Sequence, residues 1–267
     1  MPKTVNGKID KMVWEAVRKN RPLTLCLTNF VTVTDCANAV LAVGGAPVMS
    51  LDENDARELA AHAASVVLNI GTVDAPQLSA MLGAGRAARK RNLPVVLDPV
   101  GAGATKARLE AVVRILDEVG PTIIRANASE ILAVEGAGGG PRQKGVDSAG
   151  SEALARVEEA AQNVSERHSC VVAVSGKTDV LAMGKVLSSV TGGSELLTRI
   201  TGTGCMLSAL VGCCAGAVPA KPFGASMAAM NAMKEAGASA ERKLSAPGNL
   251  GEFRSRLCDE LAELAVS

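Results

Sequence analysis

Short apolar runs alternate with longer segments of helical period along the 267-residue chain. The short runs are rich in valine, leucine and isoleucine without polar alternation, which is typical of strands that are buried on both faces of a sheet. Six of these runs predict strands, at residues 23–28, 46–49, 65–70, 94–98, 122–125 and 170–175.

The segments between these runs are alanine-rich and carry apolar residues at helical spacing. They predict helices at residues 8–20, 32–43, 54–62, 76–91, 106–119, 128–134 and 152–168, with two or three more after Gly204. Strands and helices that alternate in this way indicate a mostly parallel sheet with helices on both faces.

Two later runs, 179–183 and 186–190, are separated only by Gly184 and Lys185 and predict an antiparallel hairpin. The glycine-rich stretch 136–150 is interpreted as a flexible loop within one domain, because no linker and no repeat is visible. We therefore predict one three-layer α/β/α domain over residues 1–267, with a mostly parallel central sheet and a late antiparallel hairpin.

The composition excludes several classes of protein. With 48% hydrophobic and 21% charged residues, the chain is that of an ordinary folded globule. The formal net charge is only +1, which offers no attraction to a polyanion. Three Phe, one Trp and no Tyr cannot form a row of stacking faces, so we expect no nucleic-acid partner.

Seven cysteines with irregular spacing and no C-x-x-C pair favour neither a disulfide framework nor a structural zinc site. We expect reduced thiols in a cytoplasmic protein, and the N-terminus has no apolar segment typical of a secretory signal. The uncharged stretch 201–220 begins Thr-Gly-Thr-Gly and has Pro219 near its end, so it predicts a buried helix and no membrane span.

The most informative segment is 201–205, Thr-Gly-Thr-Gly-Cys, which leads directly into the apolar helical run 206–218. Gly202 and Gly204 allow the backbone to turn its N–H groups toward one point, where the helix dipole adds positive potential. The segment therefore predicts an anion pocket, and phosphate is the obvious ligand. It is not a Walker A loop, because the Gly-Lys-Ser/Thr ending is absent. A tight turn before a buried helix is the alternative.

Cys205 falls in the first turn of the same predicted helix. The helix dipole favours a thiolate there, so we expect a lowered pKa and a thiol able to orient or deprotonate an attacking hydroxyl. The other six cysteines are interpreted as small core residues; they are Cys26, Cys36, Cys170, Cys213, Cys214 and Cys258.

Polar side chains follow two neighbouring strands. Asp98 ends one buried strand before a glycine-rich turn, and Arg125, Asn127 and Glu130 occupy the matching place after the next. Open α/β sheets bind ligands at these strand ends. Carboxylates suit Mg²⁺ and arginine suits phosphate oxygens, although each residue alone could be a helix cap or an ion pair.

Asn29 follows the first strand and Met49 ends the second, so both are candidates to line a small-molecule pocket at the mouth of the sheet. The alternatives are a helix cap for Asn29 and core packing for Met49. His62 and His168 are interpreted as structural, and no Ser-His-Asp or Cys-His pairing is indicated.

Taken together, these motifs resemble the hydroxyethylthiazole kinase family of the ribokinase-like superfamily. The resemblance covers nearly the whole chain and rests on residues 28–32, 38–39, 44–49, 98–102, 125–131 and 201–205. It implies ATP-dependent phosphorylation of the hydroxyl of 4-methyl-5-(2-hydroxyethyl)thiazole in thiamine salvage, with Mg²⁺ required. It also implies a homotrimer whose active sites form between subunits.

The resemblance further implies roles for individual residues. Asn29, Met49 and Gly202 would contact the thiazole, and Cys205 would face its hydroxyl. The amides of Gly202, Thr203, Gly204 and Cys205 would stabilise the phosphoryl group in transfer. Cysteine stands at position 205, where most members of the superfamily carry aspartate.

On the nucleotide side, the resemblance implies that Arg125, Asn127 and Ser175 contact ATP, while Asp98 and Glu130 organise Mg²⁺ and water. Ser175 stands where the family pattern leads us to expect threonine, and the hydroxyl is kept. The loop 136–144 looks longer than usual, which affects the local geometry on this side.

Three alternatives stay open. The first is a ribokinase-like kinase for another small alcohol, such as a hydroxymethylpyrimidine or a sugar. The second is an ATP- or ADP-dependent NAD(P)H-hydrate dehydratase on the same fold, against which Cys205 argues because that family carries aspartate there. The third is a nucleotide sensor, which would have no reason to keep both Asp98 and Glu130.

Overall fold

The computed structural model describes residues 5–137 and 151–266, so most of the glycine-rich stretch lies outside the described residues. One eight-stranded sheet forms the centre of the described chain, in the order β2-β1-β3-β4-β5-β6-β7-β8. The strands are β1 (Leu23–Leu27), β2 (Ala46–Met49), β3 (Ser65–Asn69), β4 (Val95–Asp98), β5 (Ile123–Asn127), β6 (Val171–Ser175), β7 (Asp179–Met183) and β8 (Val186–Val190). Strands β1 to β6 pair in parallel, and β7 and β8 are antiparallel, which confirms the predicted late hairpin.

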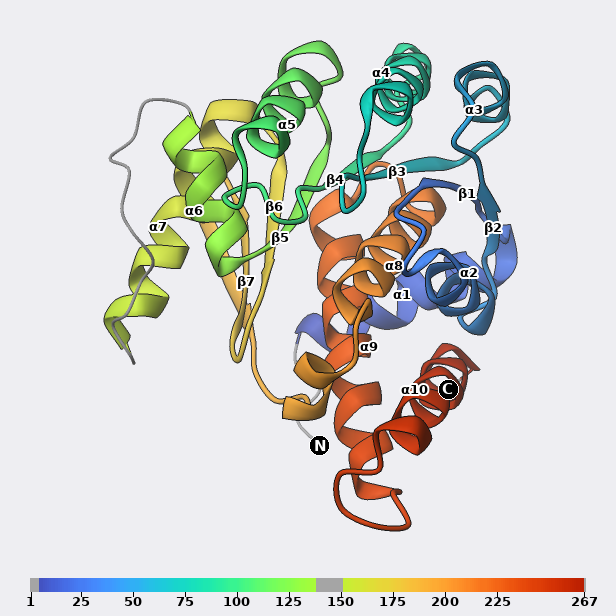
Figure 1. The fold of residues 1–267 in the computed structure, drawn as a ribbon. Helices are drawn as coiled ribbons and strands as arrows, with labels where there is room; N and C mark the ends of the chain where they lie inside the picture. Colours follow the sequence, from blue (N-terminus) through green and yellow to red (C-terminus); the bar gives the residue numbers. More distant parts are fainter. Residues whose placement is uncertain (1–4, 138–150, 267) are drawn as a thin grey trace.

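Helices cover both faces of this sheet (Figure 1). One face carries α1 (Val5–Asn20), α2 (Val33–Ala42), α8 (Thr203–Ala217) and α9 (Pro222–Arg242), with α10 (Leu250–Val266) packed outside α2 and α9. The other face carries α3 (Glu53–Ala60), α4 (Ala75–Lys90), α5 (Lys106–Glu118), α6 (Ala128–Ala137) and α7 (Ser151–His168). A short 3-10 helix, Glu195–Arg199, precedes α8. The predicted three-layer α/β/α architecture is confirmed.

Each central strand contributes to two separate cores, one on each face of the sheet. Cys26, Val67 and Val96 point into the core beneath α8, whereas Leu25 and Leu97 point into the core beneath α4 and α5. Both sets are buried, which explains why the strands read as continuous apolar runs.

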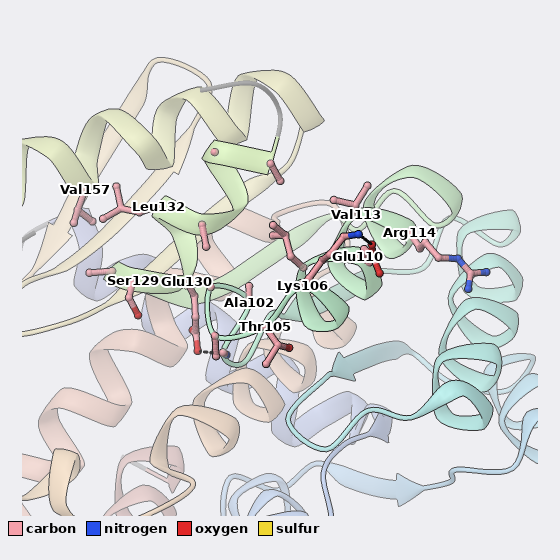
Figure 2. Close-up of a pocket in the computed structure, with 18 of the residues that line it drawn as sticks. Ala102, Thr105, Lys106, Glu110, Val113, Arg114, Ser129, Glu130, Leu132 and Val157 are labelled. Carbon is pink, nitrogen blue, oxygen red and sulfur yellow. Dashed lines mark hydrogen bonds and ion pairs between the residues drawn. The ribbon is translucent and has the colours of Figure 1, made fainter. Parts of the chain in front are cut away.

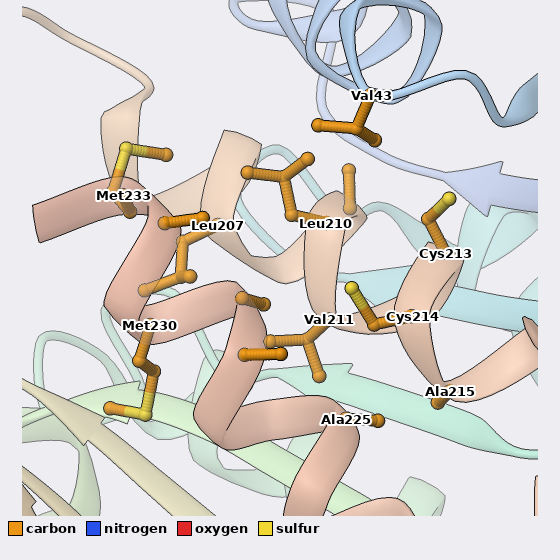
Figure 3. Packing of buried hydrophobic residues seen from close by; sticks show 14 of the residues in the cluster. Val43, Leu207, Leu210, Val211, Cys213, Cys214, Ala215, Ala225, Met230 and Met233 are labelled. Atoms are coloured by element: carbon orange, nitrogen blue, oxygen red, sulfur yellow. The ribbon is translucent and has the colours of Figure 1, made fainter. Parts of the chain in front are cut away.

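Helix α8 lies close against the sheet because glycines face it. A Cβ atom on Gly212 would lie 2.4 Å from Val67 Cγ2, and one on Gly216 would lie 3.1 Å from Ser65 Oγ. On its other side α8 packs on α9, where Leu207 and Met230 are among the buried residues (Figure 3). The stretch 201–220 therefore contains a core helix, and no helix among the described residues is long and apolar enough to cross a membrane.

The seven cysteines all lie among the described residues, and none of them forms a disulfide. The interpretation as core residues is confirmed for five of them, Cys26, Cys36, Cys170, Cys213 and Cys214, while Cys258 is half-buried beside the core under α8.

Candidate active site

Polar residues gather at the carboxyl edge of the parallel strands. Asn69 at the end of β3 pairs in register with Asp98 at the end of β4. Asn127 at the end of β5 pairs in the same way with Ser175 at the end of β6. Two strand-end residues predicted from the sequence, Asn127 and Ser175, are thus neighbours across the sheet, and Asp98 lies beside Asn69, which was not predicted.

The amino end of α8 begins at this edge. Gly202 caps the helix with φ of +92°, in the left-handed region that glycine adopts without strain. A Cβ atom at this position would lie 2.6 Å from Thr32 Cγ2, so the close approach also requires glycine. The N–H groups of the first helical turn have no intrahelical acceptor, so those of Thr203, Gly204 and Cys205 lie where the sequence predicts an anion pocket.

Cys205 faces two buried amides. Asn29 donates through Nδ2 to the Cys205 sulfur at 3.3 Å, and Asn69 donates through its own Nδ2 at 3.2 Å. The Oδ1 atom of Asn29 accepts hydrogen bonds from the backbone N–H groups of Val31 and Thr32, both at 3.1 Å. Asn29 therefore holds the turn before α2 with its oxygen and faces the site with its amide nitrogen.

The expected lowering of the Cys205 pKa is wrong. Burial raises the pKa of this thiol, and the nearby Asp98 carboxylate raises it further. Hydrogen bonds from Thr32, Asn69 and Asn29 act in the opposite direction and do not cancel the effect. The dipole argument failed because it treated the first turn of α8 as exposed, whereas burial disfavours the thiolate there.

Asp98 is fully buried beneath α8. Its Oδ2 atom accepts hydrogen bonds from Asn69 Nδ2 at 2.6 Å and from Ser208 Oγ at 2.7 Å. Its Oδ1 atom has no hydrogen-bond partner and lies 3.7 Å from Arg125 Nη1. Burial raises the pKa of Asp98 to about 6, although Arg125, Ser208 and Asn69 lower it.

A pocket of about 240 Å³ lies beside the amino end of α8. Arg125, Asn127 and Ser175, the three residues expected to contact ATP, all line it together with Thr203 and Gly204. Arg125 donates to the Ser175 hydroxyl, which fixes the guanidinium against β6. Leu197, Leu207 and Met233 supply an apolar wall.

Lys234 on α9 closes the same pocket. Its ammonium group donates to the carbonyl of Gly176 at 2.6 Å and to that of Lys177 at 3.1 Å, and it lies 3.0 Å from Asp179 Oδ1. The Asp179 carboxylate in turn accepts the Gly176 N–H at 2.9 Å. Lys234 and Asp179 are both buried, so they fix the turn between β6 and β7 beside Ser175.

Glu130, at the start of α6, lines a larger hollow of about 1620 Å³ between the β4–α5 loop and helices α5, α6 and α7 (Figure 2). Its two carboxylate oxygens accept the backbone N–H groups of Gly101 at 2.9 Å and Asn127 at 2.8 Å. Glu130 thus ties the loop after β4 to the start of α6. Among the described residues, no group of three or more His, Cys, Asp or Glu side chains could hold a metal ion.

A family model for the hydroxyethylthiazole kinase family matches residues 14–267. The chain belongs to the hydroxyethylthiazole kinase family. A hydroxyethylthiazole kinase from Nitratidesulfovibrio vulgaris (strain DSM 19637 / Miyazaki F) is 43% identical over 251 residues, covering 94% of this chain and 91% of that protein. A solved structure of the hydroxyethylthiazole kinase protein from Pyrococcus horikoshii OT3 has a TM-score of 0.86 and 34% identity, covering 96% of this chain and 93% of that one.

The fold is shared more widely. A ribokinase-like superfamily protein from Enterococcus faecalis V583 has a TM-score of 0.63 at 10% identity, covering 96% of this chain and 94% of that one. This similarity shows the fold alone, and it confirms the expected ribokinase-like class. Membership of the hydroxyethylthiazole kinase family makes the chain a phosphotransferase.

In this hydroxyethylthiazole kinase family member, Met49 lies at the same edge of the sheet as Asn29, because it pairs in register with Cys26 on β1. Met49 is half-buried against the core under α8. Asn29 is followed by Phe30 and Val31, which are 71% and 55% exposed. The predicted thiazole side is thus bordered by apolar surface.

Sequence reasoning missed three residues of this kinase site, which are Asn69, Ser208 and Lys234. Asn69 carried a signal, because it ends a strand immediately before Ile70 and Gly71 as Asp98 ends one before a glycine turn. Ser208 is a single hydroxyl inside an apolar helical run, a position where a buried partner is expected. Lys234 has no motif around it, and only the packing of α9 on β6 and β7 brings it to the pocket.

Proposed function

We propose that the protein transfers the γ-phosphoryl group of ATP directly to the hydroxyl of 4-methyl-5-(2-hydroxyethyl)thiazole. The observation that carries the proposal is the placement of two consecutive residues at the start of α8. Cys205 faces Asn29, and a Cβ atom on Gly204 would lie 2.7 Å from Arg125 Nη1. The amides of this turn therefore lie between the proposed acceptor side and the proposed nucleotide side, where a phosphoryl group in transit needs stabilisation.

The nucleotide is proposed to occupy the pocket lined by Arg125, Asn127 and Ser175. Arg125 is 6% exposed and already held by Ser175, so its charge is pre-positioned for phosphate oxygens. Its Nε atom is buried without a hydrogen-bond partner, which is consistent with a side chain completed by a ligand.

On the acceptor side, Asn29, Met49 and Gly202 are proposed to contact the thiazole and Cys205 to contact its hydroxyl. The raised pKa of Cys205 makes this thiol a poor general base at neutral pH. Phosphoryl transfer through a loose transition state requires little help from a base, so the thiol is assigned to orienting the hydroxyl. The amides of Gly202, Thr203, Gly204 and Cys205 supply the main electrostatic stabilisation.

The residues present fit a magnesium ion. Asp98 Oδ1 is a buried carboxylate oxygen without a hydrogen-bond partner, and Mg²⁺ favours oxygen ligands. Glu130 retains lone pairs beyond the two backbone N–H groups that it accepts. Because Mg²⁺ keeps several waters and binds phosphates, two carboxylates are sufficient. Bound there, the ion would neutralise charge on the transferring phosphate.

We also propose a homotrimer with active sites between subunits. Apolar side chains are exposed around the thiazole side: Phe30 and Val31 after Asn29, and Leu51 after β2. A second copy of the chain would bury them and close the site over the thiazole. Large apolar side chains exposed beside a site favour a protein interface over open solvent.

The cytoplasm is the proposed location, because it supplies ATP and keeps thiols reduced. The seven cysteines, none of which forms a disulfide, support this proposal. Residues 1–267 are proposed to act as one kinase domain.

A coupled assay of ADP release tests the substrate. Hydroxyethylthiazole and hydroxymethylpyrimidine are compared at equal concentration with ATP and Mg²⁺. Turnover is expected with hydroxyethylthiazole. Turnover with the pyrimidine alone would overturn the proposed substrate in favour of another alcohol kinase.

Sedimentation velocity tests the trimer. Phe30→Asp is expected to shift the protein toward the monomer and to lower turnover, because it places a charge in the proposed interface. Leu187→Asp is the matched control, since Leu187 is an exposed apolar residue on β8, outside the group Phe30, Val31 and Leu51. A wild-type monomer, or a trimer unchanged by Phe30→Asp, would contradict the proposed assembly.

A further inference from the structure

Asn69 contacts both Cys205, on the proposed acceptor side, and Asp98, on the proposed phosphate side. It is 1% exposed at the end of β3, between β1 and β4. Its Nδ2 atom donates to Asp98 Oδ2 at 2.6 Å and to Cys205 Sγ at 3.2 Å. Its Oδ1 atom accepts from Asn29 Nδ2 and from the Gly71 backbone N–H, both at 3.0 Å. Both N–H groups and both lone pairs of the amide are therefore used.

The orientation of this amide is fixed by chemistry. A backbone N–H can only donate, so the Gly71 N–H requires an oxygen at the near side of Asn69. Asn29 is oriented in the same way by the N–H groups of Val31 and Thr32. Both amides must therefore present nitrogen toward Cys205, whose sulfur accepts two N–H donors.

Hydrogen bonds also fix the orientation of the Asp98 carboxylate. Asn69 and Ser208 both donate to its Oδ2 atom, which leaves Oδ1 directed toward Arg125. Leucine at position 69 would leave the Gly71 N–H and the Asn29 N–H that points to Asn69 without an acceptor, and it would remove one hydrogen bond to Asp98. Aspartate would keep the two accepted bonds and lose the N–H donor to Cys205. Its second oxygen would face Asp98 Oδ2, so the two carboxyl groups would share one proton in place of the present N–H bond.

We propose that Asn69 is a positioning residue for phosphoryl transfer, which holds the Asp98 carboxylate and the Cys205 thiol in a fixed relative orientation through its two N–H groups. The inference rests on the proposed kinase function. It assigns Asn69 no contact with the thiazole, the nucleotide or the transferring group. Asn69 acts through Cys205 on the acceptor hydroxyl and through Asp98 on the phosphate side.

Asn69→Asp separates this role from a merely structural one, because it retains the acceptors for Gly71 and Asn29, removes the N–H donor to Cys205 and replaces the N–H donor to Asp98 with a shared proton that leaves the net charge of the pair unchanged. We expect kcat to fall on the order of 100-fold, the size seen when one positioned donor is removed from an active site. The KM for ATP is expected to stay within about twofold, and so is the affinity for ADP measured calorimetrically on metal-free protein, because Asn69 has no bond to Arg125 or Ser175.

Thr122→Val is the matched control. The Thr122 hydroxyl bonds to the backbone of Val95 at the opposite end of β4, so its loss weakens the sheet without reaching the site. This variant is expected to lower the melting temperature and to keep the wild-type kcat.

A double-mutant cycle with Cys205→Ala completes the test. If Asn69 acts partly through Cys205, the loss of kcat in the double variant is smaller than the product of the two single losses. Asn69→Asp with wild-type kcat, a loss confined to KM for ATP, or fully multiplicative losses in the cycle would each overturn the inference. Absence of turnover by the wild-type protein would instead overturn the proposed function.

Discussion

The α-carbon of Gly204 lies against the guanidinium of Arg125, so that a Cβ atom there would approach Nη1 to 2.7 Å and Nη2 to 3.0 Å. Gly204 is helical, and alanine at such a position normally favours the helix by about 1 kcal/mol. Glycine at position 204 therefore lowers the stability of the helix. It is nevertheless required, because a side chain there would displace the Arg125 guanidinium.

Gly204→Ala should consequently separate stability from function. The methyl group displaces the Arg125 guanidinium from Ser175 and Asp98, so we expect the KM for ATP to rise about tenfold, or 1.4 kcal/mol, while the melting temperature stays unchanged or rises. Steady-state kinetics and thermal unfolding measure the two effects. Gly251→Ala on α10 is the control, because its added Cβ would point into open space beside its own helix. An unchanged KM for ATP would contradict the assigned contact.

A second prediction compares Cys205→Ala with Gly202→Val. The valine would clash with Thr32 and strain a backbone with φ of +92°, so it disturbs the amides themselves and should cost at least about 100-fold in kcat/KM. Cys205→Ala removes a thiol that is not expected to act as a base, so the loss should be below the roughly 100-fold typical of a lost general base. Kinetics giving the reverse order would contradict these roles.

A third prediction concerns the stability of the metal-free protein as pH changes. Burial raises the pKa of Asp98 from 3.8 to about 6, so the folded protein keeps a proton that the unfolded chain releases between these values. The contribution of Asp98 to stability is complete below pH 4 and is lost as pH rises through 6.

Asp98→Asn should remove this dependence. The free energy of unfolding of the variant, minus that of the wild type, is expected to grow from pH 4 to pH 7 by at most about 3 kcal/mol. Urea unfolding at a series of pH values gives the difference. A difference that is constant over this range would contradict the raised pKa.

A fourth prediction concerns the buried pair of Lys234 and Asp179. Lys234→Met leaves the Asp179 carboxylate buried without its cation, which should destabilise the fold by about 3–5 kcal/mol. The turn between β6 and β7 loses its anchor as well, so the KM for ATP should rise. Denaturant unfolding and kinetics measure both effects.

Two further variants test whether the charge causes the loss of stability. Lys234→Met combined with Asp179→Leu should recover most of it, because neither charge is then left alone. Lys11→Met removes an exposed pair with Glu15 and should change stability by less than about 1 kcal/mol. Equal effects of Lys234→Met and Lys11→Met would contradict the structural importance of the buried pair.

The sheet was predictable because its strands are buried on both faces and their boundaries coincide with glycine, proline or polar residues. Even the antiparallel turn at Gly184 and Lys185 is local in sequence. The spatial order of the strands was not predictable, because it depends on which helix crosses which face. That order brings Asn69 beside Asp98.

The candidate site was predictable where chemistry follows a strand end, as for Asp98 and Arg125. It was not predictable where burial decides the chemistry. The pKa of Cys205 depends on how deeply α8 sits, and the pairing of Lys234 with Asp179 depends on a helix more than fifty residues away in sequence.

Gly212 and Gly216 set how closely α8 lies on the sheet, and Gly212 is about 12 Å along the helix from Gly204. Because a helix is stiff over this length, its two ends move together as a rigid body. A side chain inserted between α8 and Val67 would pivot the helix and shift the amides that face the phosphate. Substitutions at Gly212 or Gly216, in the buried core, are therefore expected to alter the position of these amides from a distance.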